Sequence, residues 1–133
     1  MKVILHENPI GKPRMTQRDK WKQRDIVIAY RAWADLLRYK AFGKNKKIAL
    51  QQPTRVLITA FFDSGRDHRC GPHSVRPDID NIEKGVLDAL FLNDQVIYRC
   101  VTQKFWCDGG RPRIEIEWYE DTPHNPQQKD ATT

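Results

Sequence analysis

The segment from Arg55 to Phe62 most constrains the fold, because it is nearly continuously apolar and rich in β-branched and aromatic residues. A short run of this composition predicts a central β-strand buried on both faces, so other elements have to cover it. The chain has 133 residues, 39% of them hydrophobic, which is enough for one domain with a real core. We therefore expect a single small domain built around this strand.

Helical periodicity occurs on both sides of this strand. Apolar residues from about Trp21 to Phe42 recur at helical spacing, and Gly43 is a stop signal. A second helix is expected from about Asp80 to Leu90, although Gly85 within it costs about 1 kcal/mol relative to alanine. Close packing or the approach of a substrate would explain a glycine there, and the sequence does not distinguish the two.

Three further strands complete the predicted order. We expect a short strand at Lys2 to Glu7, a longer one at Gln95 to Phe105, and its hairpin partner at Arg113 to Trp118. The order β-α-β-α-β-β predicts an α+β domain, with a mixed β-sheet packed against two main helices. This domain is expected to span residues 1–118. Residues 119–133, in which apolar side chains are scarce, are expected to form a flexible tail.

The charge and the cysteine content bound the function. The net charge is +6 and the pI is near 9.4, which favours polyanionic partners, although many soluble domains are modestly basic and bind nothing charged. The three cysteines are an odd number and widely spaced, which predicts reduced thiols in a cytosolic protein. No apolar run approaches the about 20 residues of a membrane span, and the N-terminus lacks a signal-peptide core. We therefore expect a soluble, cytoplasmic protein.

Acidic residues gather in one segment of this basic chain. Asp78 and Asp80 stand at the start of the second predicted helix, Lys84 follows one turn later, and Asp94 lies just past the helix. In a purely structural interpretation, Asp80 is the N-cap and pairs weakly with Lys84. In a functional interpretation, Asp78, Asp80 and a folded-back Asp94 bind Mg²⁺, which prefers oxygen ligands and activates water. Lys84 then holds the scissile phosphate or stabilises its developing charge.

The motif around these acids has a recognisable pattern. Pro77-Asp78-Ile79-Asp80-Asn81-Ile82 is followed by Lys84, by Leu87-Asp88-Ala89-Leu90, and by Asn93-Asp94 before Gln95-Val96. This pattern resembles the RusA-like family of Holliday junction resolvases. Near the N-terminus, Gly11-Lys12-Pro13-Arg14 also looks like the basic segment of phage-borne members of that family.

The resemblance implies a homodimeric, Mg²⁺-dependent endonuclease, with Mn²⁺ as a possible substitute, that nicks four-way DNA junctions symmetrically in recombination and repair. It also implies a cytoplasmic site of action in a bacterial host, with a phage or prophage as the source. The catalytic acids of the family correspond to Asp78, Asp80 and Asp94, and its lysine corresponds to Lys84. Two departures affect Asp94: Asn93 replaces the first acid of the usual pair, and the connection before Gln95 is shorter than usual.

Basic residues near the acidic motif are candidate DNA contacts. The candidates are Lys12, Arg14, Arg18, Arg69 and Arg76. Each phosphate that such a residue neutralises makes binding more sensitive to salt, with a slope of about −0.9 per contact on duplex DNA. For any single one of them, a solvated position on the surface is the alternative.

Three other functions stay open on the sequence alone. A nuclease with a looser preference for flaps or replication forks would have the same motif. A junction-binding protein without catalysis is disfavoured, because binding alone gains nothing from carboxylates that face phosphates. A plain structural domain predicts neither DNA affinity nor a response to Mg²⁺. A zinc site is disfavoured too: Cys70 and His73 have ligand spacing, but Cys100 and Cys107 are too far apart to form a second tight pair.

Overall fold

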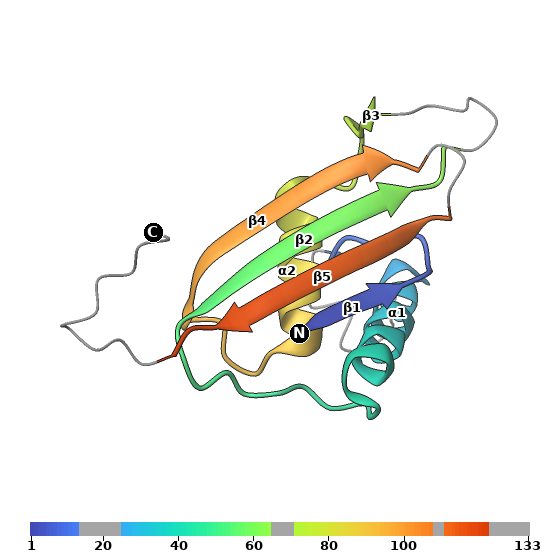
Figure 1. Cartoon of the computed structure of the whole chain (residues 1–133). Helices are drawn as coiled ribbons and strands as arrows, with labels where there is room; N and C mark the ends of the chain where they lie inside the picture. The colour runs from blue at the N-terminus through green and yellow to red at the C-terminus, as the bar shows by residue number, and fades with distance from the viewer. Residues whose placement is uncertain (14–24, 65–70, 108–110, 123–133) are drawn as a thin grey trace.

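Two helices cover one face of a five-stranded sheet in the computed structural model of the chain (Figure 1). The structure describes residues 1–13, 25–64, 71–107 and 111–122. Along the chain the elements are β1 (Lys2–Leu5), α1 (Asp25–Phe42), β2 (Thr54–Phe62), β3 (Gly71–Pro72), α2 (Ile79–Leu90), β4 (Ile97–Trp106) and β5 (Arg113–Glu120). This confirms the predicted α+β fold with a mixed sheet and two main helices, and adds the short strand β3.

Strand β2 lies in the middle of the sheet, whose order is β1-β5-β2-β4-β3. It pairs in parallel with β4 and antiparallel with β5, and β1 pairs antiparallel with β5. The hairpin predicted between Gln95–Phe105 and Arg113–Trp118 is therefore wrong, because β2 separates these two strands. The most apolar strand takes the position with neighbours on both edges, and that preference outweighs the proximity of β4 and β5 in the sequence.

The central strand is buried on only one face. Val56, Ile58 and Ala60 point towards the helices and are at most 3% exposed. On the other face, Arg55 is exposed and Leu57 is half-buried. The expectation of burial on both faces is therefore wrong, because α1 and α2 pack on the same side of the sheet (Figure 1).

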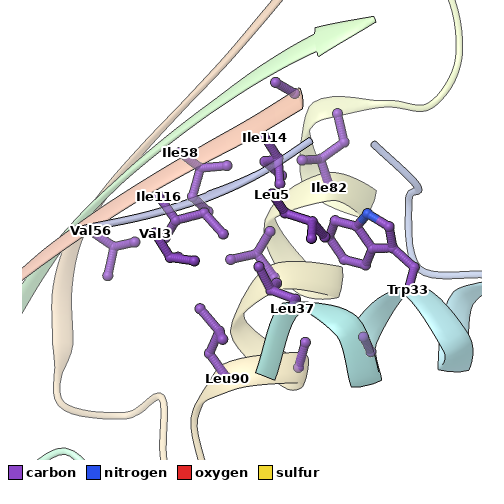
Figure 2. Packing of buried hydrophobic residues seen from close by; sticks show 14 of the residues in the cluster. Val3, Leu5, Trp33, Leu37, Val56, Ile58, Ile82, Leu90, Ile114 and Ile116 are labelled. Carbon is purple, nitrogen blue, oxygen red and sulfur yellow. The ribbon is translucent and has the colours of Figure 1, made fainter. Parts of the chain in front are cut away.

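The hydrophobic core fills the space between the sheet and the helices (Figure 2). Its members come from both layers, and Figure 2 labels Val3, Leu5, Trp33, Leu37, Val56, Ile58, Ile82, Leu90, Ile114 and Ile116. Burying one large apolar side chain contributes about 1.5–3 kcal/mol. Because α2 supplies several of these side chains and also carries the acidic motif, the core fixes where that motif lies.

The ends of some elements differ from the predicted ones. Helix α1 is described from Asp25, and residues 21–24 of the predicted helix lie outside the described residues. Strand β5 continues through Tyr119 and Glu120, which the sequence assigned to the tail. The tail from residue 123 onward lies outside the described residues and stays a prediction. Neither described helix combines the length and the hydropathy that a membrane crossing requires.

Candidate active site

Asp78 and Asp80 stand at the start of helix α2. Asp78 occupies the N-cap position with an extended backbone, and its side chain makes no capping hydrogen bond. Asp80 lies in the first helical turn, so its predicted role as N-cap is wrong. Both residues are exposed. The positive end of the helix dipole favours negative charge at this position, and because the carboxylate of Asp78 is not used as a cap, it is available to a ligand.

Lys104 holds the segment that leads into Asp78. Its ammonium donates hydrogen bonds to the carbonyl oxygens of Val75 and Pro77, at 2.9 and 3.0 Å. The backbone of His73 donates in turn to the Lys104 carbonyl oxygen, at 3.1 Å. The sequence analysis missed this lysine. The sequence feature that could have identified it is a charged residue on the face of β4 that turns towards the helices, where an apolar residue is usual.

His73 is buried in the same region. Its ring lies 4.0 Å from that of Phe62 and 4.3 Å from that of Trp106, measured between centroids. Burial and the charge of Lys104 lower the pKa of His73, so the neutral imidazole is favoured. His73 therefore packs as an aromatic residue beside the site, and within the described residues no three His, Cys, Asp or Glu side chains are close enough to hold a metal.

The N-terminal segment packs against helix α2 through two glycines. The backbone N–H of Lys12 donates to the carbonyl oxygen of Asn81, at 3.0 Å. A Cβ on Gly11 would lie 2.7 Å from the Cβ of Pro77, and one on Gly85 would lie 3.2 Å from the Lys12 nitrogen. Close packing, rather than room for a substrate, is therefore what the structure gives for Gly85.

Contacts from Tyr30 on α1 and Asp88 on α2 also hold the N-terminal segment and helix α2 together. The hydroxyl of Tyr30 donates to the carbonyl oxygen of Gly85, at 2.7 Å. Burial, with a contribution from the charge of Asp88, raises the pKa of Tyr30 to about 12, so the hydroxyl keeps its proton. The ammonium of Lys12 pairs with Asp88. A DNA phosphate would have to compete with this carboxylate for Lys12, and Asp88 has a structural partner outside the acidic pair.

A cavity of about 530 Å³ opens between the N-terminal segment and the start of α2. It is lined by Pro9, Ile10, Gly11, Lys12, Pro13, Ile26, Arg76, Pro77, Asp78 and Asn81. The charged groups at its wall are two cations and one carboxylate, and Arg76 is exposed. This combination suits a phosphate group next to a bound cation. Of the other predicted DNA contacts, Arg14, Arg18 and Arg69 lie outside the described residues.

Lys84 lies on the same side of α2 as Asp80, while Asp94 follows the other end of the helix. Lys84 is exposed and follows Asp80 by four residues, which share a helix face. Asp94 comes after the far end of α2, whose 12 residues span about 18 Å. Within the described residues no three His, Cys, Asp or Glu side chains gather to hold a metal, and the role of Asp94 beside Asp78 and Asp80 stays a prediction.

Asn93 explains why the loop before β4 stays where it is. Its side-chain amide accepts a hydrogen bond from the Leu50 nitrogen at 2.8 Å and donates one to the Leu50 oxygen at 2.9 Å. A carboxylate can accept the first bond but cannot donate the second. The amide at this position therefore serves the structure, and Asp94 next to it is exposed.

An α+β domain with paired carboxylates at a helix start, and cations beside them, has the arrangement expected of an enzyme that hydrolyses phosphodiesters. The sequence matches the family Endodeoxyribonuclease RusA over residues 7–118. Because this is most of the chain, the protein belongs to that family of endodeoxyribonucleases, which act on Holliday junctions. A comparison with curated proteins gave no match.

Proposed function

We propose that this protein is a Mg²⁺-dependent, homodimeric resolvase that makes paired, symmetric nicks in four-way DNA junctions. The observation that carries the proposal is the position of Asp78 and Asp80. Both carboxylates are exposed at the positive end of α2, and Asp78 shares a cavity wall with Lys12 and Arg76. Carboxylates beside a cavity with two cations at its wall have little use in a phosphate-binding site without a metal ion between them and the substrate.

The donor set suits Mg²⁺ and its usual substitute Mn²⁺. Both ions take carboxylate oxygens and keep positions for water and substrate phosphate, and Asp78 and Asp80 offer only carboxylate oxygens. When bound, the ion supplies Lewis-acid stabilisation of the charge that develops on the phosphate and the leaving oxygen. A lysine ammonium has no lone pair with which to bind such an ion, so the proposal uses no lysine as a metal ligand.

The cations of the chain have separate tasks in this proposal. Lys84, one turn after Asp80, extends from the exposed face of α2 and can bind an oxygen of the scissile phosphate. Arg76 lies at the cavity wall two residues before Asp78 and can bind a neighbouring phosphate with its planar guanidinium. Lys104 positions the segment between these residues and does not touch the substrate.

A second copy of the chain supplies the third acid. The 12 residues of α2 span about 18 Å, and Asp94 follows the end of the helix that is opposite to Asp78 and Asp80. In a two-fold dimer, Asp94 of one copy can lie beside Asp78 and Asp80 of the other, and two equivalent sites result. Two equivalent sites related by a two-fold axis match the near two-fold symmetry of a four-way junction.

The test compares cleavage of three labelled DNAs: a four-way junction, its matched linear duplex and a flap. Each is incubated with the wild type in Mg²⁺, in Mn²⁺ and in EDTA, and with Asp80→Asn. The matched control is Asp35→Asn, which removes the charge of a half-buried acid on α1 that pairs with Arg38.

Paired nicks on the junction alone are expected, with loss of cleavage in EDTA and in Asp80→Asn and normal cleavage in Asp35→Asn. Equal cutting of the flap would replace the junction preference with a broader branched-DNA nuclease. Tight junction binding with no cutting in either metal would leave only a binding protein.

A further inference from the structure

The face of the sheet opposite to the helices is open in the described part of the chain. Helices α1 and α2 both lie on the other face, and no described element covers this one (Figure 1). Successive residues of a strand point to opposite faces. The inward residues of β2 include Val56, Ile58 and Ala60, so the residues between them point to the open face. None of these outward residues is buried, so a partner can reach them.

The parallel strands β2 and β4 set residues of the same kind side by side on the open face. The register pairs Arg55 with Arg99, Leu57 with Val101, Thr59 with Gln103 and Phe61 with Phe105. These four pairs form the β2–β4 track, which is about 20 Å long at 3.3 Å per residue. The track begins with two cations, continues with aliphatic and uncharged polar pairs, and ends with two rings. It therefore holds no acid along its whole length.

A cavity of about 370 Å³ lies at the cationic end of the track. It is lined by Arg55, Val56, Leu57, Arg99, Val101 and Tyr119. Both arginines are exposed, and the ring of Tyr119 is 51% exposed with the Arg55 guanidinium 5.7 Å from its centroid. Arg55 has one acid, Asp121, at 3.4 Å. Like charges side by side on a sheet are destabilising, so an anion between Arg55 and Arg99 would relieve their repulsion.

Aromatic rings form the other end of the track. The rings of Phe61 and Phe105 stack with centroids 5.8 Å apart and an angle of 28° between their planes. The guanidinium of Arg113 lies 3.8 Å from the Phe61 centroid, so a planar group already stacks on a ring here. Phe105 directly follows Lys104, whose ammonium holds the Pro77 carbonyl oxygen. The ring pair therefore lies at the end of β4 that holds the segment before the acidic pair.

The acids of the open face lie on β5, beside the track, and both have cations next to them. Glu115 is 2.8 Å from Arg113 and 3.6 Å from Lys2, and Glu117 is 3.4 Å from Lys2. These two cations and two acids balance, so the arginine pair of the track leaves the face positive. Even with Asp121 included, the cations outnumber the acids. The charge of the face therefore suits an anionic partner.

We propose that the β2–β4 track binds an unpaired strand of DNA, with bases on Phe105 and Tyr119 and phosphates at the arginine pair. Aromatic rings and guanidinium planes stack on any base, and cations beside them follow the backbone. A protein partner fits less well, because Thr59 and Gln103 divide the apolar side chains into two small groups, whereas a protein interface has a packed apolar core. The inference goes beyond junction cleavage, since it concerns a strand outside the duplex arms and needs no metal.

Fluorescence anisotropy of a short labelled oligothymidylate measures this binding to the full chain, in EDTA and at low salt. Oligothymidylate does not pair with itself, and EDTA removes any metal-dependent binding at the acidic pair. Three variants change the track: Phe105→Leu, Tyr119→Leu and Arg99→Gln. The matched controls are Tyr39→Leu and Arg31→Gln, which change an exposed tyrosine and an exposed arginine of α1. Thermal melting checks that each variant is folded.

Each ring variant should bind the oligothymidylate about five- to a hundredfold more weakly, which is the range for the loss of one stacked base. Arg99→Gln should weaken binding and lower the slope of log affinity against log salt by about 0.7, the value for one phosphate of a single strand. Both controls, and Asp80→Asn, should bind like the wild type. Tyr119 is exposed, so Tyr119→Leu carries the test if Phe105→Leu does not fold.

Three results would overturn the proposal: no binding by the wild type at low salt, equal weakening in the α1 controls, or loss of binding in Asp80→Asn, which would place the strand at the acidic pair. A track that binds an acidic peptide but no oligothymidylate would assign this face to a protein partner instead. The nuclease assay separates the two ideas. Junction cleavage without oligothymidylate binding contradicts only this inference, and oligothymidylate binding without cleavage contradicts only the proposed function.

Discussion

Replacing Lys104 with methionine should loosen the segment before Asp78 and impair both stability and cleavage. Methionine keeps the length of the side chain but loses the two hydrogen bonds to the carbonyl oxygens of Val75 and Pro77. A hydrogen bond from a charged group contributes about 1.5–3 kcal/mol, and the exposure of one of these bonds places their sum near 2–3 kcal/mol. For a chain of this size the melting temperature should fall by about 4 °C per kcal/mol, or about 8–12 °C.

Urea and thermal unfolding measure the stability of this variant, and single-turnover cleavage of a four-way junction measures its rate. A displacement of about 1 Å at a reacting group costs about a hundredfold in rate, so cleavage should fall by about ten- to a hundredfold at saturating Mg²⁺. The matched control is Lys46→Met, which removes an exposed lysine from the loop after α1.

The variant has a further spectroscopic readout. The charge of Lys104 helps to lower the pKa of His73, so the His73 pKa should rise in Lys104→Met when followed by NMR titration. If stability, cleavage and this pKa all match those of Lys46→Met, Lys104 does not hold the segment as described.

Two smaller predictions concern His73 and Asn93. The pKa of His73 is lower in the folded state than its unfolded value of about 6.5, so the unfolded state takes up the proton first. The free energy of unfolding should therefore fall as pH drops below about 6.5, and urea titrations of His73→Gln at pH 7.5, 6 and 5 should show a smaller fall; equal slopes would contradict this. Asn93→Asp should lose about 1–3 kcal/mol at pH 7, because a carboxylate then faces the Leu50 oxygen without a proton to donate. The loss should shrink near pH 4, where the acid is protonated, and a variant as stable as the wild type at pH 7 would show that the amide pair contributes nothing.

Local periodicity was enough to predict the main helices and strands, and to predict that Asp80 and Lys84 share a helix face. A helix repeats every 3.6 residues, so the spacing of Asp80 and Lys84 places them on one face wherever the helix lies. The apolar composition of Arg55–Phe62 likewise indicated the central strand. These features depend on neighbours within a few positions, and the sequence displays such neighbours directly.

The contacts between elements could not be read in this way. The position of Asp94 depends on the direction of the chain after α2. The pairing of β5 with β2 depends on which strand occupies the centre of the sheet. Lys104 and Gly11 matter because residues about 27 and 66 positions away lie against them. Such contacts are decided by the packing of the whole domain, since many pairings satisfy the same local pattern.

The sequence by itself therefore determined the fold class, the acidic pair at the start of α2 and the family resemblance that its spacing carries. Only the tertiary structure decided that β2 lies between β4 and β5 and that Lys104 holds the segment before the acidic pair. The physical reason is that side-chain periodicity is a property of each element alone, whereas distances between elements follow from how the apolar faces of all of them are buried together.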